Sequence, residues 1–177
     1  MHMLDIAQNS LAAGASSVEL TLAADEEKNL LSVTVADNGR GMDAELLARA
    51  SDPFTTTRTT RKVGMGLALF RWSAESSGGS FSISSQPGKG TSVHASYVLS
   101  SFDRMPLGNL TETVITLIQG SPDVDFTLTV KRNGQEFLFD TREIRQTLEG
   151  VPIDAPEVLG FLSEYLNGHT AALIDGL

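Results

Sequence analysis

Apolar and polar residues follow two different periods along the first forty residues. Between residues 4 and 12 the apolar positions recur at helical spacing, and Gly14 follows them as a helix stop. The segments 17–23 and 30–37 instead alternate with period two, and a short charged turn joins them. We therefore expect an N-terminal helix followed by two paired strands.

The same patterns continue to about residue 99. A helix is predicted over 43–51, a second from 64 or 65 to 76, and a hairpin over 78–99. The second helix is expected to be buried because of its apolar residues Leu67, Leu69, Phe70, Trp72 and Ala74. This order of elements predicts an α/β fold (an α+β sandwich), in which a mixed, mostly antiparallel sheet is backed by helices on one face.

The remaining chain predicts a small α+β extension. A helix is expected over 109–120, then a hairpin turning at Asn133-Gly134, then two helices stopped by Gly150 and Gly168. The hairpin is expected to pack on its own core because its large apolar side chains need burial: Phe126, Leu128, Phe137 and Phe139. Binding of a partner by this hairpin is the alternative.

A change of character near residues 100–108 divides the chain into two parts. Residues 1–100 are expected to form the main domain and residues 101–177 the extension. Whether the two parts share one sheet is left open by the pattern.

Composition narrows the function. The 177 residues contain no cysteine, so disulfides and thiolate chemistry are excluded. No run is apolar enough to span a bilayer and no secretory signal is evident, so we expect a cytoplasmic protein with no membrane partner. The net charge of -9 argues against nucleic acid.

One basic cluster stands out against this acidic background: Arg58, Arg61, Lys62 and Arg71. Such a cluster indicates a small anion rather than a polymer. A solvated loop with a few cations is the alternative.

The segment LDIAQNSLAAGA (4–15) places Asp5 and Asn9 four residues apart, so they share one face of a helix. An amide oxygen can complete the coordination of Mg2+ already carried by phosphates, and a carboxylate one turn earlier can orient or deprotonate a water or hydroxyl. The alternative is the polar face of a surface helix.

The segment DNGRGM (37–42) follows a predicted strand. Asp37 can accept a hydrogen bond from an exocyclic amine such as adenine N6, and Gly39 and Gly41 would let the backbone pass close to a flat ring. An ordinary strand-to-helix turn is the alternative, because Asn-Gly favours turns.

The segment GMGLALF (64–70) runs from a glycine turn into a helix, whose unpaired N–H groups could bind an anion. It lacks the Lys-Ser/Thr pair of a P-loop, and it follows a loop rather than the strand of a dinucleotide-binding fold. Alone it is weak evidence.

Together, these segments resemble the GHKL ATPase superfamily, which includes gyrase-type topoisomerases, the large heat-shock chaperones, histidine kinases and MutL-type repair proteins. LDIAQNSLAAGA looks like the N box of that superfamily, DNGRGM like its first glycine box and GMGLAL like its second. DPFTTTR (52–58) resembles the ATP lid of histidine kinases, and GKGT (88–91) occupies the place of a Gly-Thr segment. The resemblance covers roughly residues 3–99.

This resemblance implies ATP and Mg2+ as ligands. Asn9 would bind the metal, Asp37 would contact the adenine, and Asp5 would be the catalytic carboxylate. The other residues implied to bind the nucleotide are Gly39, Gly41, Met42, Thr56, Thr57, Arg58, Arg61, Lys62, Gly64, Met65, Gly66, Leu67 and Thr91.

The family usually has Glu where this chain has Asp5, one methylene shorter, so the resemblance supports binding more firmly than fast hydrolysis. The N box begins almost at Met1, so we expect an N-terminal element to be missing or unusually short. We expect an ATP-binding regulatory protein that phosphorylates a protein partner or signals to it by shape, with homodimerisation left open. The alternatives are a MutL- or gyrase-type ATPase module and a scaffold with a degenerate pocket.

Overall fold

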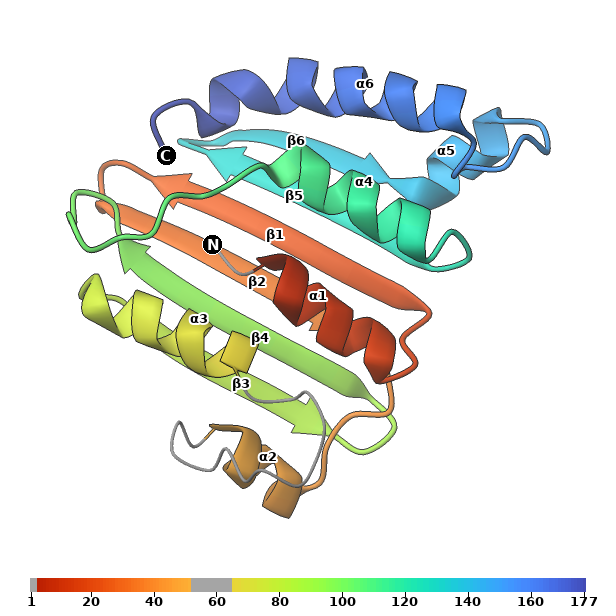
Figure 1. The fold of residues 1–177 in the computed structure, drawn as a ribbon. Helices are drawn as coiled ribbons and strands as arrows, with labels where there is room; N and C mark the ends of the chain where they lie inside the picture. Colours follow the sequence, from red (N-terminus) through yellow and green to blue (C-terminus); the bar gives the residue numbers. More distant parts are fainter. Residues whose placement is uncertain (1–2, 52–64) are drawn as a thin grey trace.

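The computed structural model describes residues 3–51 and 65–177, which form six strands and six helices (Figure 1). The strands are β1 (Ser17–Asp25), β2 (Leu30–Asp37), β3 (Ser80–Gln86), β4 (Gly90–Val98), β5 (Asp125–Arg132) and β6 (Gln135–Asp140). The helices are α1 (Met3–Ala12), α2 (Ala44–Ser51), α3 (Met65–Ser76), α4 (Leu110–Gly120), α5 (Thr141–Thr147) and α6 (Pro156–Ile174).

All six strands belong to one sheet with the order β3-β4-β2-β1-β5-β6. The β1–β5 pair is parallel and the other four pairs are antiparallel. The predicted mixed, mostly antiparallel sheet is therefore confirmed. The register sets Asp37 at the end of β2 directly opposite Thr91 of β4, which brings two of the predicted site residues together.

The helices cover one face of the sheet, as predicted (Figure 1). Along β1 the buried positions alternate with more exposed ones, which is the pattern of a sheet packed on one side only. Helices α3, α1, α4 and α6 form a row over that side, since α1 contacts both α3 and α4, and α4 contacts α6. One hydrophobic core lies between the helix row and the sheet.

The C-terminal hairpin extends the same sheet, because β5 pairs with β1. Asn133 and Gly134 connect β5 to β6 with φ of 48° and 84°, as a type I′ turn requires. The hairpin buries Phe126, Leu128 and Phe139 in the common core. The division into domains 1–100 and 101–177 stays a prediction.

Two details of the predicted helices are wrong. Leu69 and Trp72 are not buried: 40% and 62% of these residues are exposed. The 3.6-residue period places Leu67, Phe70 and Ala74 on the face toward the sheet and turns the other two outward.

The last helix does not stop at Gly168 but continues through it to Ile174. A glycine weakens a helix without ending it when burial compensates. Here the added turn buries Thr170 and Leu173, and the Thr170 hydroxyl donates to the carbonyl of Leu166 at 2.8 Å.

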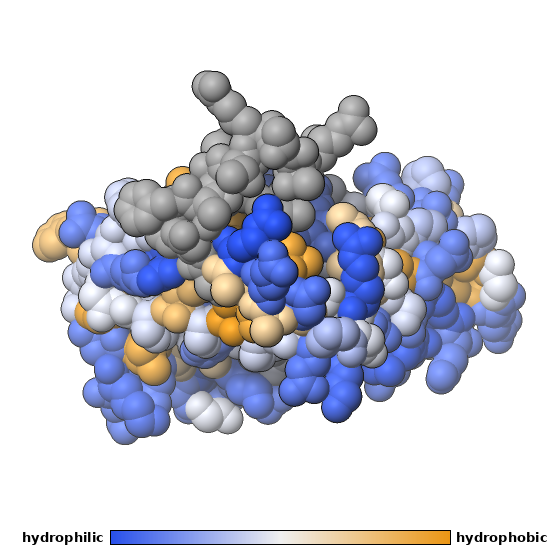
Figure 2. Space-filling model, turned by 90° about the horizontal axis from the view of Figure 1, so that it is seen from below, coloured by the Kyte–Doolittle hydropathy of each residue, from blue (hydrophilic) through white to orange (hydrophobic). Residues whose placement is uncertain are grey.

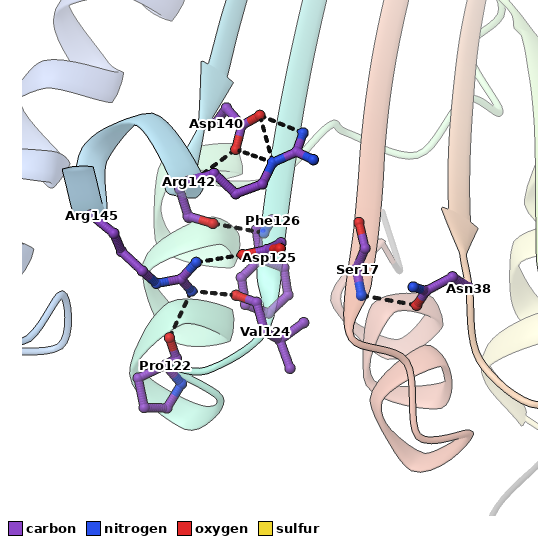
Figure 3. Close-up of polar contacts among 10 residues, drawn as sticks. Ser17, Asn38, Pro122, Val124, Asp125, Phe126, Asp140, Arg142 and Arg145 are labelled. Carbon is purple, nitrogen blue, oxygen red and sulfur yellow. Dashed lines mark hydrogen bonds and ion pairs between the residues drawn. The ribbon is translucent and has the colours of Figure 1, made fainter.

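Arg145, in the last turn of α5, fastens this helix to the start of β5 (Figure 3). The Arg145 guanidinium donates to the Asp125 carboxylate and to the carbonyls of Pro122 and Val124, the latter two at 2.7 and 2.6 Å. Asp140 caps α5 by accepting from the backbone N–H of Arg142 at 2.8 Å. We call Arg145 and its three acceptors the arginine clamp.

The surface seen from the side of α2 is mostly hydrophilic, with small separate apolar patches (Figure 2). Within residues 3–51 and 65–177, no helix is both long and apolar enough to cross a membrane.

Candidate functional site

The carboxylate of Asp37 lies at the centre of the polar contacts where β2 ends. Its Oδ1 accepts from the backbone N–H of Gly39 at 2.9 Å and from that of Thr91 at 3.2 Å. Its Oδ2 accepts from the hydroxyl of Ser10 at 2.6 Å. Three donors from α1, the loop after β2 and strand β4 therefore fix this side chain.

Asn38 fastens the same loop to the turn before β1 (Figure 3). Its side-chain oxygen accepts from the backbone N–H groups of Ser16 and Ser17, both at 2.9 Å. Its amide donates to the Ser16 hydroxyl at 2.9 Å. Asn38 therefore has a structural role: it holds the loop that carries Asp37 close to the turn that follows α1.

Glycines allow three backbone segments to meet around Asp37. Gly41 has φ of 66°, and a Cβ on it would collide with the carbonyl of Gln86, the last residue of β3. Gly90 has φ of 87°, and a Cβ there would collide with the carbonyl of Asp37 itself. A Cβ on Gly39 would press on the carbonyl oxygen of Ala13 at 3.0 Å. The first glycine box thus serves close backbone packing.

The contacts of Met42 and Thr91 run through Ser85 of β3. The Met42 backbone N–H donates to the Ser85 hydroxyl at 2.8 Å. The Ser85 and Thr91 hydroxyls lie 2.9 Å apart. The predicted contact of Thr91 with adenine stays a prediction; in the structure its backbone supports Asp37 and its hydroxyl pairs with Ser85.

The start of α3 packs against the N-box helix α1. A Cβ on Gly66 would lie 3.1 Å from the Cβ of Asp5, so glycine permits this close approach. Asp5 is exposed, and Asn9, one turn later on the same face of α1, is half-buried. The carboxylate and the amide that the sequence singles out therefore lie on the α1 face toward the start of α3.

Several predicted residues cannot be placed. The predicted nucleotide-binding residues between the two glycine boxes lie outside the described residues, as does Gly64 of the second box: Thr56, Thr57, Arg58, Arg61 and Lys62. Three other predicted residues are placed by the structure. Met65 is the first residue of α3, and Leu67 is buried in the core. Arg71, from the basic cluster, bonds Glu75 at 2.8 Å.

A groove at the far end of β1 and β2 lies away from this site. It is lined by charged side chains that pair within it, Lys28 with Asp25 and Lys131 with Glu136 at 3.2 Å. Because these charges already neutralise one another, the groove offers no net charge to an anion.

Sequence reasoning missed Ser10 and Asn38. The signal for Ser10 is its place in the helix, since Ile6, Ala7 and Ser10 share the buried face of α1. A serine at a core position needs a hydrogen-bond partner, but the sequence does not reveal that the partner is Asp37.

The match to a family model covers this site. Residues 2–101, more than half of the chain, match the family described as histidine kinase-, DNA gyrase B- and HSP90-like ATPase. The chain belongs to this ATPase family. The predicted GHKL resemblance is confirmed.

Among curated proteins, the chain is similar to sensor kinases. Over 69 residues it is 38% identical to the C4-dicarboxylate transport sensor protein DctB of Pseudomonas aeruginosa. This aligned segment covers 38% of this chain and 11% of that protein. Over 103 residues it is 27% identical to a sensor histidine kinase, NtrY-like, of Rickettsia conorii, covering 58% of this chain and 17% of that protein. The matches thus span a small part of these relatives.

A solved structure shares the fold. The N-terminal domain of a DNA repair protein aligns with a TM-score of 0.50 at 18% identity, over 77% of this chain and 50% of that one. The alignment extends past the residues that match the family model, and it concerns the fold alone.

Proposed function

We propose that this chain binds ATP with Mg2+ beside Asp37, and acts as a regulatory protein of the histidine kinase-like branch. The observation that carries the proposal is the fixed Asp37 carboxylate, held by three donors at the end of β2. The membership of the ATPase family and the similarity to sensor kinases support it.

The donor set around Asp37 fits a purine base with an exocyclic amine. A carboxylate oxygen accepts about two hydrogen bonds. Oδ1 already accepts two from the protein, whereas among the described residues Oδ2 accepts one, from Ser10. The exocyclic amine of adenine would donate to the acceptor position left on Oδ2.

The phosphates would lie at the N-terminal end of α3, beside α1. Gly66 and the first N–H groups of α3 would face them, and the lid residues that precede α3 in the sequence would contribute cations. Asn9 would complete the coordination of a Mg2+ ion carried by the phosphates. Within residues 3–51 and 65–177, no cluster of three or more acidic or histidine side chains could hold a metal by itself.

Bound ATP supplies a γ-phosphoryl group for transfer. Asp5 lies on the same α1 face as Asn9 and can accept a proton from a water or a partner's hydroxyl, or orient it. Phosphotransfer to a protein partner is the activity that we propose for these groups. If transfer does not occur, the binding of ATP would itself act as a switch for that partner.

Calorimetric titration with Mg-ATP tests the binding. Unmodified protein should bind, and Asp37→Asn should bind about 10- to 100-fold more weakly, since a hydrogen bond to a charged group contributes about 1.5–3 kcal/mol. The amide retains an oxygen for Gly39 and Thr91, so the fold should survive, as thermal unfolding without nucleotide would verify. Equal affinity in both proteins would refute the proposed site.

Incubation with ATP labelled at the γ-phosphate separates the possible outcomes of binding. Free phosphate that disappears in Asp5→Asn would identify hydrolysis assisted by Asp5, and label on protein would identify a kinase. Intact ATP with proven binding would identify a switch. ATP-driven dimerisation, measured by light scattering, would instead favour the MutL- or gyrase-type alternative.

A further inference from the structure

Ser10 lies in the N-box segment LDIAQNSLAAGA, but the family resemblance implies no role for it in the site. It follows Asn9 in α1 and is buried, with 4% of the residue exposed. Its hydroxyl has one hydrogen and two acceptors within reach, Asp37 Oδ2 at 2.6 Å and the Ile6 carbonyl oxygen at 3.4 Å. The shorter contact, to a charged acceptor, takes the hydrogen.

This hydrogen bond fixes how Asp37 presents its second oxygen. The two backbone donors hold Oδ1, and Ser10 alone among the described residues holds Oδ2. Without the hydroxyl, Oδ2 would have two acceptor positions open, and only the donors to Oδ1 would hold the carboxylate. With it, one acceptor position is left.

We infer that Ser10 is a positioning residue that selects the base of the nucleotide through Asp37. This inference rests on the proposed function, because it concerns the same pocket. Ser10 leaves Oδ2 ready for one donor at one place, which suits an amine on the purine six-membered ring. A base with hydrogen in place of the amine would make no hydrogen bond to Oδ2. A base with a carbonyl oxygen there would be repelled by the lone pair of Oδ2.

The test compares two nucleotides and two proteins. Ser10→Ala and the unmodified protein are each titrated by calorimetry with Mg-ATP and with purine riboside triphosphate, which has hydrogen in place of the 6-amino group. Removal of Ser10 should weaken ATP binding about 3- to 10-fold, the effect of one hydrogen bond. Binding of the analogue without the amine should change less than about twofold, since that ligand makes no use of Oδ2.

Control variants separate positioning from packing. Ser10→Thr keeps the hydroxyl and should restore most of the preference for ATP. Ser77→Ala removes another buried hydroxyl, which lies directly after α3 and donates to the Ala74 carbonyl at 2.8 Å, and should leave both affinities unchanged. Thermal unfolding without nucleotide reports on the fold, and Ser10→Cys, close in volume but a poor donor, replaces Ser10→Ala should the alanine protein not fold.

The outcomes are distinct. Equal weakening of both nucleotides would make Ser10 a merely structural residue, and unchanged ATP affinity would remove it from the site; each result overturns the inference while the proposed function stands. If the unmodified protein binds neither nucleotide, the proposed function fails and the inference fails with it.

Discussion

Two neighbouring regions at the same edge of the sheet are held together by different kinds of contact. Asp37 pairs with Val18 of β1, and Asp125, the partner of Arg145, pairs with the adjacent Ser17. Around Asp37 the loop after β2 is fixed by backbone N–H groups, one buried hydroxyl and glycines that leave no room for a side chain. Around Arg145 the junction of α5 and β5 is fixed by long charged side chains, 30% exposed in the case of Arg145 (Figure 3).

The difference reflects the role of each region. A ligand pocket needs fixed acceptors and a backbone that can come close, so small residues and backbone donors suit it. A structural junction needs only to hold two elements, and an arginine that reaches several carbonyls does this while tolerating movement. We therefore expect substitutions in the Asp37 region to lower stability through steric collisions. Substitutions at the arginine clamp should lower stability where its acceptors lose their donor.

The largest effect is expected at Gly41. Gly41→Ala places a methyl group against the Gln86 carbonyl at positive φ, so the free energy of unfolding should fall by about 3 kcal/mol or more. Gly88→Ala is the matched control, since Gly88 also has positive φ (73°) but nothing lies within 4 Å of its Cβ position. That variant should lose about 1 kcal/mol. If denaturant titrations show equal losses of unfolding free energy in the two variants, close backbone packing does not determine the structure around Asp37.

An intermediate effect is expected at the arginine clamp. Arg145→Ala leaves the carbonyls of Pro122 and Val124 and the Asp125 carboxylate without their donor, which should cost about 1–3 kcal/mol. Arg142→Ala, whose side chain is 57% exposed, should cost less than about 1 kcal/mol. Urea unfolding of the two variants measures the contrast, and a reversed order would contradict the role given to Arg145.

The smallest effect is expected from acid at Asp140. The Arg142 guanidinium, followed by the Arg142 backbone N–H, holds the pKa of Asp140 below its usual value although burial opposes this. Because the folded pKa lies below the unfolded value of about 3.9, the stabilisation is present above about pH 4 and lost as pH falls through the folded pKa.

Asp140→Asn keeps the helix cap and removes the charge. The variant should be less stable than the unmodified protein at about pH 6, and this difference should shrink as the pH falls to about 3. Thermal unfolding across that range measures the difference. A stability difference that stays constant with pH would mean that the charge of Asp140 adds nothing to the stability of the protein.

Local pattern predicted most of the fold, because each helix and strand carries its own period and stop. The helix after Asp43, for example, begins where an Asp side chain accepts from the Leu46 backbone N–H at 2.8 Å. What local pattern could not predict are pairings between distant segments. The parallel placement of β5 beside β1 and the contact of Ser10 with Asp37 both join residues far apart in sequence.

The same division applies to the candidate site. Motif spacing singled out Asp37 and its glycines, and the structure brings Asp37, Gly39 and Thr91 into direct contact. The reason for Gly41 lies in Gln86, more than forty residues later, and so could not be derived from the loop alone. Trp72 lies outside the core because the helical period turns it outward, and the apolar content of the segment alone does not reveal that direction.

The most direct test of the account follows the backbone amide signals of 15N-labelled protein by NMR while Mg-ATP is added. The account predicts saturable shifts at the amides of Gly39 and Thr91, which donate to Asp37, and their loss in Asp37→Asn. Shifts confined to the distant groove beside Lys28 and Lys131, or no shifts at ligand concentrations in the millimolar range, would contradict it.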